Sequence, residues 1–224
     1  MEQSDSPNHT TRVKICGITS IEDARAAAQA GADYLGYILY HKSPRYIAPP
    51  RIRAITNILR LEFPQLQHVG VFVDSSHDGV CRTVDLAGLD MAQLHGVEAA
   101  DFCDALKERG VRHVKVLRFG AAAPVVRCAD FPTADYYLAD TFDTKDAGGT
   151  GCAFDYSLLP TDLPIQRTFL AGGLTAATVA EAIAGVRPFA VDVSSGVEIS
   201  PGKKSHDKIR EFIASAKSLG ESPV

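Results

Sequence analysis

The stretch TFLAGGLTAATVAEAIAGVRPFAVDVSSGVE, residues 168–198, decides the fold class of this chain. Two short apolar runs, Thr168–Leu170 and Ala190–Val193, flank the alanine-rich segment Ala176–Ile183, so the sequence predicts a strand, a helix and a second strand. Both strands are followed by small residues that let a backbone approach a ligand closely and bind phosphate through N–H groups. The alternative is two ordinary tight turns. The residues concerned are Gly172, Gly173, Ser194, Ser195 and Gly196.

The same alternation of strand and helix extends outward along the whole chain. Six further apolar runs predict strands, and most are continuous, as expected for parallel strands covered on both faces. They are Val13–Cys16, Tyr34–Leu39, His68–Val73, Met91–Leu94, Val114–Leu117 and Tyr136–Ala139. Eight strand–helix units in about 210 residues predict a single (β/α)₈ TIM barrel, with an open doubly wound sheet as the alternative.

The segments between the strands predict helices. We assign Ile21–Ala30, Pro49–Leu61 and Ala99–Arg109 besides the alanine-rich helix already named. A last helix carries one apolar stripe, formed by Ile209, Phe212, Ile213 and Ala216. We expect four basic side chains on or near its solvent side, namely Lys204, Lys208, Arg210 and Lys217.

Composition places the chain among ordinary globular proteins. It has 224 residues, with 23 Lys and Arg against 27 Asp and Glu, and therefore a net charge of −4. Apolar residues make up 46% and charged residues 22%, which excludes the composition of a disordered chain. The slight acidity argues against non-specific nucleic-acid binding, and no apolar run approaches the roughly 20 residues that span a bilayer. We therefore expect neither nucleic acid nor membrane as a partner.

The N-terminus and the cysteines bear on compartment and domain organisation. The first eleven residues, MEQSDSPNHTT, lack the pattern of a secretory signal, so we predict a disordered tail over 1–11 and one catalytic barrel domain over 12–220. The cysteine count is odd and shows no zinc-ligand spacing, so we expect no metal site and a reducing, cytoplasmic location. The cysteines are Cys16, Cys81, Cys103, Cys128 and Cys152.

Two strand ends carry side chains suited to acid–base chemistry, because the active site of a parallel barrel lies where strands end. Cys16 ends the first strand and can act as a general base if a neighbouring cation lowers its pKa. The alternative is a small buried side chain. Asp140 follows the sixth strand and precedes a long glycine-rich segment, which fits an acid beneath a mobile lid; the alternative is a turn cap.

Two other strand ends carry polar side chains suited to binding. Arg45 lies in the basic segment that follows the second strand and can hold a carboxylate or phosphate as a bidentate fork. The alternative is a solvated basic turn. Gln93 and His95 alternate with Leu94 at the end of the fourth strand, so both can face the barrel mouth, and a structural histidine is the alternative.

These strand ends together resemble the phosphoribosylanthranilate isomerases of tryptophan biosynthesis. The matching segments run in order over nearly all of the chain after the tail, and the most specific are KICGIT, KSPRY, QLHG and DVSSGVE. The full set is VKICGIT (13–19), GADYLGYILYHKSPRYI (31–47), VGVFVD (69–74), QLHG (93–96), LADT with GGTG and FDY (138–156), FLAGGL (169–174) and VDVSSGVEISPGKK (191–204).

The resemblance implies an Amadori rearrangement of N-(5-phosphoribosyl)anthranilate to 1-(2-carboxyphenylamino)-1-deoxyribulose 5-phosphate, without metal or cofactor. It implies that Cys16 is the general base, that Asp140 is the general acid and that Arg45 holds the anthranilate carboxylate. It implies phosphate binding by the two glycine-rich turns and a pocket lined by His95 and Asp192, to which the strand pattern adds Gln93. The expected partner is the small-molecule substrate, and the expected assembly is a monomer, with a homodimer as the alternative.

One departure from the family and four alternatives stay open. Cys152 stands where the family commonly has Lys or Arg after GGTG, which leaves closure of that loop in question. Histidine-pathway isomerases pair two Asp at strand ends, which Cys16 disfavours. Indoleglycerol-phosphate synthase needs a lysine at a strand tip, whereas Lys14 and Lys115 lie within predicted strands. Metal-dependent pentose-phosphate epimerases need His and carboxylate ligands around the barrel mouth, which His95 alone does not supply. A non-catalytic barrel that binds a phosphorylated metabolite is the fourth alternative.

Overall fold

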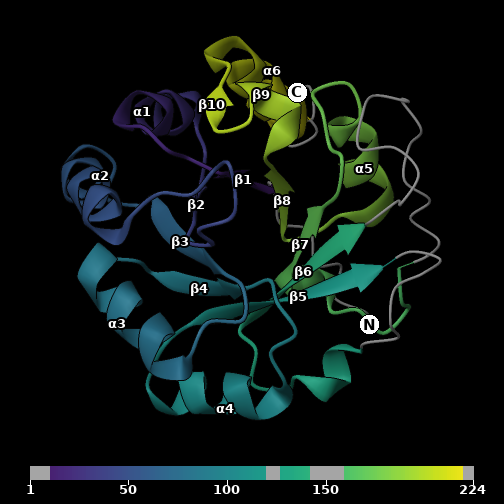
Figure 1. The fold of residues 1–224 in the computed structure, drawn as a ribbon. Helices are drawn as coiled ribbons and strands as arrows, with labels where there is room; N and C mark the ends of the chain where they lie inside the picture. Colours follow the sequence, from purple (N-terminus) through teal and green to yellow (C-terminus); the bar gives the residue numbers. More distant parts are fainter. Residues whose placement is uncertain (1–10, 120–126, 142–158, 219–224) are drawn as a thin grey trace.

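The strands of the chain close into a single parallel barrel (Figure 1). The structure is a computed structural model and describes residues 11–119, 127–141 and 159–218. Eight strands follow one another around the barrel in chain order, and β1 pairs with β8 to close it. They are β1 (Arg12–Cys16), β2 (Tyr34–Ile38), β3 (Gln67–Phe72), β4 (Met91–Leu94), β5 (His113–Phe119), β6 (Tyr136–Thr141), β7 (Thr168–Ala171) and β8 (Ala190–Val193). The predicted TIM barrel is confirmed, and the open sheet is excluded.

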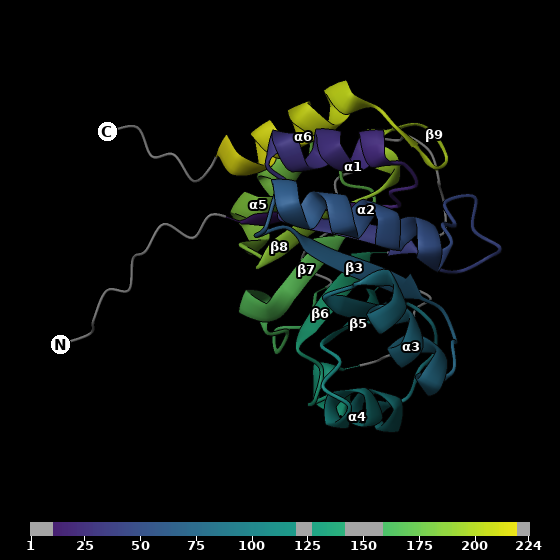
Figure 2. The ribbon, with the colours of Figure 1, turned by 90° about the vertical axis from the view of Figure 1, so that its left-hand side faces the viewer.

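Helices ring the barrel, and Figure 2 shows α1, α2 and α6 along its outside. The described helices are α1 (Ile21–Ala30), α2 (Pro49–Glu62), α3 (His77–Ala87), α4 (Ala100–Glu108), α5 (Val179–Val186) and α6 (His206–Lys217). Ser20 caps α1 by accepting a hydrogen bond from the backbone N–H of Asp23, as the sequence predicts. Within the described residues none of these helices is long and apolar enough to cross a membrane.

One predicted helix is wrong in its bounds. Helix α5 begins three residues later than expected, because Thr175 and Thr178 form a hydrogen-bonded turn before it. The described parts of the β5–β6 and β6–β7 connections contain only 3₁₀ helices, Cys128–Asp130 and Ile165–Arg167, and the rest of both connections lies outside the described residues. The remaining six strand–helix units match the predicted pattern.

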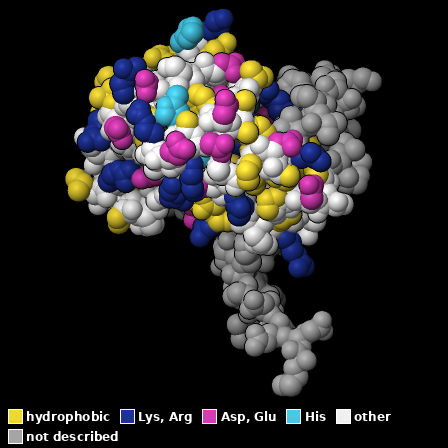
Figure 3. Space-filling view, turned by 90° about the horizontal axis from the view of Figure 1, so that it is seen from below, with side chains coloured by type: hydrophobic (Ala, Val, Ile, Leu, Met, Phe, Trp, Pro, Cys, Tyr) yellow, Lys and Arg dark blue, Asp and Glu magenta, His cyan; other side chains and the backbone are white. Residues whose placement is uncertain are grey.

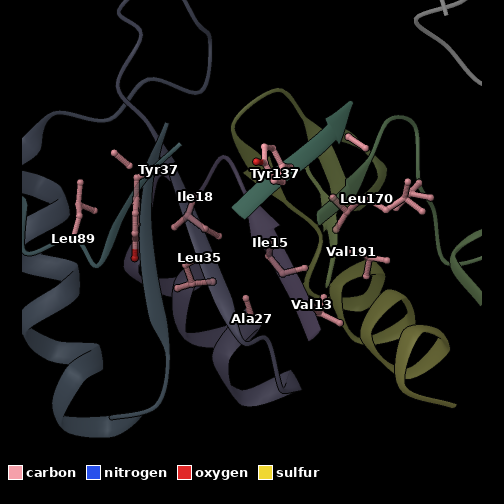
Figure 4. Close-up of a cluster of buried hydrophobic side chains, with 14 of the residues drawn as sticks. Val13, Ile15, Ile18, Ala27, Leu35, Tyr37, Leu89, Tyr137, Leu170 and Val191 are labelled. Carbon is pink, nitrogen blue, oxygen red and sulfur yellow. The ribbon is translucent and has the colours of Figure 1, made fainter. Parts of the chain in front are cut away.

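The core has two layers because side chains alternate across each strand. Odd-numbered residues of β1, such as Val13 and Ile15, pack with Leu35 of β2 between the barrel wall and the surrounding helices (Figure 4). The second layer lies inside the barrel and is filled by residues such as Tyr34, Val114 and Phe169. Lys14 and Cys16, two even-numbered residues of β1, therefore face the barrel interior.

One face of the barrel carries mixed charge. Figure 3 shows both basic and acidic side chains on this face. The predicted disordered tail lies outside the described residues except for Thr11, whose side chain is buried. The glycine-rich segment after β6, including Cys152, and the C-terminal residues 219–220 of the predicted domain also lie outside them.

Candidate active site

A cavity of about 260 Å³ opens at the carboxyl ends of the strands. Its apolar floor includes Ile38, Val71 and Leu138, and its polar lining brings together every site residue that the sequence predicts. These are Cys16, Arg45, Gln93, His95, Asp140, Gly172, Gly173, Asp192, Ser194, Ser195 and Gly196. A larger and more open hollow of about 520 Å³, between the first turns of α1 and α6, contains none of them.

Cys16 lies at the end of β1, directly opposite Gly36 of β2. Its side chain is buried but lines the cavity. A Cβ atom on residue 36 would lie 2.6 Å from Cys16 Sγ, so only glycine leaves room for the thiol there. Burial raises the pKa of this thiol overall, while the ammonium group of Lys14 opposes that increase. A cationic neighbour is therefore present, but burial outweighs its effect on the pKa.

Asp192 is held by a buried ion pair inside the barrel. The Nζ atom of Lys14 donates to Asp192 Oδ1 at 2.9 Å, and both side chains are almost completely buried. Lys14 and Asp192 are register partners where β1 closes against β8. The structure thus gives Asp192 a partner that the sequence did not reveal.

Asp140 and His95 face each other across the cavity from β6 and the end of β4. His95 Nε2 lies 3.5 Å from Asp140 Oδ2, an ion-pair distance when the ring is protonated. On its other side, His95 Nδ1 lies 3.3 Å from Gln93 Nε2. Gln93 lines the cavity, and its Oε1 atom is buried without a hydrogen-bond partner among the described residues.

Arg45 is anchored by a carboxylate that sequence reasoning assigned no role. Its Nε donates to Glu198 Oε1 at 2.9 Å and its Nη2 to Glu198 Oε2 at 2.6 Å. Glu198 also accepts from Lys204 Nζ at 2.9 Å. Burial raises the pKa of Glu198, and the hydrogen bonds from Arg45 and Lys204 outweigh this effect and lower it overall. The DVSSGVE motif and the following lysine were the available signal.

Lys204 corrects one sequence-based expectation. We expected it on the solvent side, but only 2% of the residue is exposed. Besides Glu198, its ammonium group donates to the backbone oxygen of Ser194 at 3.2 Å. These contacts draw the side chain under the turn after β8. Lys208, Arg210 and Lys217 of α6 are exposed or partly exposed, as expected.

The two glycine-rich turns lie side by side at the end of β7 and β8. The second forms a short 3₁₀ helix, Ser195–Val197. A Cβ atom on Gly196 would lie 2.1 Å from the backbone oxygen of Leu174, so the two turns approach closely only because residue 196 is glycine. Both turns line the cavity.

No group of three His, Cys, Asp or Glu side chains suited to a metal ion occurs among the described residues. The eight-stranded barrel, with its polar cavity at the carboxyl ends of the strands, defines the class of the protein as a (β/α)₈-barrel enzyme. The model of the N-(5'-phosphoribosyl)anthranilate isomerase family matches residues 13–215, and the chain belongs to this family.

Individual relatives agree with this assignment. The N-(5'-phosphoribosyl)anthranilate isomerase of Geobacter sp. strain M21 is 45% identical over 209 residues, which are 93% of this chain and 99% of the relative. The crystal structure of phosphoribosyl anthranilate isomerase from Thermotoga maritima is 40% identical, has a TM-score of 0.78 and covers 93% of this chain and 100% of its own. A second crystal structure of a phosphoribosyl anthranilate isomerase, in complex with reduced 1-(o-carboxyphenylamino)-1-deoxyribulose 5-phosphate, is 39% identical with a TM-score of 0.75, covering 93% of this chain and 100% of its own.

Proposed function

We infer that this chain is a phosphoribosylanthranilate isomerase of tryptophan biosynthesis, which converts N-(5-phosphoribosyl)anthranilate to 1-(2-carboxyphenylamino)-1-deoxyribulose 5-phosphate. One observation carries the inference from the structure: a single cavity contains a thiol, a carboxyl group, an arginine and two glycine-rich turns. Isomerisation of an aminoaldose to an aminoketose needs an acid and a base, together with sites for the two anionic ends of the substrate.

The acid and base divide the proton transfers between them. Asp140, as the acid, protonates the ribose ring oxygen, so that the ring C–O bond breaks and a protonated Schiff base forms at C1. Cys16, as the thiolate, removes the proton from C2, and the electron pair of that C–H bond moves into the C1–C2 bond while the iminium π electrons return to nitrogen. Proton transfer to C1 and loss of the C2 hydroxyl proton then give the aminoketose. General acid–base groups of this kind each contribute about 10²–10⁴-fold.

The binding groups are already oriented. Arg45 uses one edge of its guanidinium on Glu198, which leaves its other N–H groups for the anthranilate carboxylate. Gln93 Oε1 is placed to accept a hydrogen bond from a sugar hydroxyl. The paired turns that contain Gly172, Gly173 and Gly196 are proposed to hold the phosphate.

The activity is tested by making the substrate in place from anthranilate and phosphoribosyl pyrophosphate with an anthranilate phosphoribosyltransferase. The decay of phosphoribosylanthranilate fluorescence is followed in the presence of a chelator. We expect a decay rate that scales with this protein. A rate equal to spontaneous breakdown would instead support the non-catalytic phosphate-binding barrel, and histidine-pathway substrates would then be tried.

We propose that the enzyme is cytoplasmic and acts as a monomer. A Thermotoga maritima relative, 39% identical with a TM-score of 0.73, is described as a dimeric enzyme from which monomers were generated. Light scattering over a range of protein concentrations decides between the two assemblies, because a homodimer would double the measured mass.

A further inference from the structure

A buried lysine that no proton transfer uses lies beside the proposed base. We propose that Lys14 is a positioning residue that stabilises and orients the thiolate form of Cys16. The inference rests on the proposed role of Cys16, and it adds a group that acts through that base. It accounts for a cation placed deep inside the barrel, where an unpaired charge is costly.

The geometry brings the two side chains together. Lys14 and Cys16 are two residues apart on β1, so both point into the barrel. A Cβ atom on Gly36 would lie 2.6 Å from Cys16 Sγ and 3.1 Å from Lys14 Nζ, so both atoms occupy the space above that one glycine. Nζ of Lys14 and Sγ of Cys16 therefore lie within about 6 Å of each other, the range in which a cation favours the charged form of a neighbouring acid.

Among the neighbouring charges, Lys14 favours the thiolate most, although burial is the larger effect and opposes it. The Asp192 carboxylate on β8 raises the pKa of the thiol, whereas Lys204 lowers it less than Lys14 does. Arg45, from the β2–α2 loop, and Lys204 both bind Glu198, whose single negative charge offsets one of their two positive charges. Burial lowers the pKa of Lys14, but Asp192 and Cys16 together raise it by more than burial lowers it. The pKa is therefore raised overall, and Lys14 retains its ammonium form.

An ammonium group has more than one N–H donor, so Lys14 can serve Asp192 and Cys16 together. Asp192 accepts one hydrogen bond at 2.9 Å and fixes the position of Nζ. The inference assigns another of these donors to Sγ. During turnover the C2 proton moves to Sγ and Lys14 keeps all of its protons, so that the base returns to a neutral thiol beside an intact Lys14–Asp192 pair.

The test measures the ionisation of Cys16 in the free enzyme. Alkylation by iodoacetamide is followed across a pH series, and mass spectrometry of the Cys16 peptide separates this thiol from the other cysteines. We expect Lys14→Met to move the midpoint of the rate to higher pH by about 1–3 units, the usual effect of losing an opposite charge at this range. Lys14→Arg, which keeps the charge, should recover part of the shift.

Lys115→Met is the matched control. Lys115 is also a buried barrel lysine, and it pairs with Glu98 at 2.9 Å, but it has no contact with Cys16. We expect this variant to lose stability without moving the Cys16 midpoint. Lys14→Met leaves the Asp192 carboxylate buried without its partner, and this variant can fail to fold. The Cys16 midpoint is therefore also compared between Asp192→Asn and the double variant Lys14→Met/Asp192→Asn, which both lack that carboxylate.

The inference would be overturned if the Cys16 alkylation midpoint were the same in Asp192→Asn and the double variant. It would also be overturned if a folded Lys14→Met had the same midpoint as the wild type. Failure of the proposed function looks different, because it appears in Cys16→Ala. Turnover near the wild-type rate in Cys16→Ala would remove Cys16 from the mechanism and, with it, the catalytic purpose of Lys14, even if the pKa shift is found. A shifted midpoint together with loss of turnover in Cys16→Ala supports both.

Discussion

Arg45 and Glu198 form a doubly hydrogen-bonded ion pair at the cavity rim, although 153 residues separate them in the chain. The pair holds the arginine flat against the β8 side of the mouth before substrate binds. Glu198 is in turn fixed by Lys204 and by the backbone N–H of Gly202. A preorganised guanidinium loses little side-chain entropy when it takes up a second anion, which is what a carboxylate-binding residue needs.

Arg45→Ala should raise KM by about 10–100-fold and change kcat less, because a hydrogen bond to a charged group contributes about 1.5–3 kcal/mol. Glu198→Gln keeps the shape of the anchor and removes its charge, so we expect a smaller rise in KM. Steady-state kinetics of both variants measure the effect. An unchanged KM in Arg45→Ala would contradict the assignment of this residue to the substrate carboxylate.

Cys16→Ala and Asp140→Asn should each lower kcat by at least about 10²-fold while substrate binding persists, since each removes one proton-transfer group. Single-turnover fluorescence decay measures the chemical step directly. Cys103→Ala is the control for loss of a buried thiol, because Cys103 lies in helix α4 and not in the cavity. A variant of either residue with a near wild-type rate would exclude that residue from the mechanism.

Gly36→Ala should lower kcat by about 10²-fold, because its Cβ atom would displace Cys16 Sγ, and misplacement of a reacting group by about 1 Å costs this much. Gly70→Ala on β3 is a control with an equal clash, since its Cβ atom would lie 2.6 Å from Leu89 Cδ1 in the outer core. Both variants should unfold at lower temperature, but only Gly36→Ala should lose kcat. Equal losses of kcat would show that Gly36 acts through stability alone.

His68 should make the fold sensitive to acid. Its Nδ1 lies 3.0 Å from the hydroxyl of Tyr37 in the outer core, and burial lowers its pKa from 6.5 to about 4. The folded state therefore binds the proton less readily than the unfolded state, and the stability present above about pH 6.5 is lost as the pH falls through 4. The free energy of unfolding should fall by about 3 kcal/mol over this range from His68 alone.

Urea unfolding of wild type and His68→Gln at about pH 7 and about pH 4 measures this contribution. Glutamine keeps an acceptor for Tyr37 and does not titrate, so its stability should fall less. Both proteins share the effects of His113, whose pKa is also lowered by burial, and of the carboxyl groups. Parallel losses in the two proteins would show that His68 does not contribute.

Several elements were predictable to the residue from local sequence. Strands β4 and β8 and helix α1 have the predicted bounds, because apolar runs and capping residues are local signals. Helix α5 was misplaced, because a turn held by Thr175 and Thr178 replaces its expected first turn. The site residues could also be predicted from the sequence, for a related reason. The carboxyl ends of all strands in a parallel barrel meet on one face, so side chains at strand ends converge wherever the chain places them.

The sequence by itself therefore determined the barrel, the family and the members of the cavity. Only the tertiary structure decided how the charges pair. Lys14 meets Asp192 across 178 residues, and Lys204 turns inward to Glu198 in place of facing solvent. Strand periodicity determines which face of the sheet a side chain occupies, but its partner depends on how β1 closes against β8. The environment of the Cys16 thiol is set by that closure, because charges act through space and not along the chain.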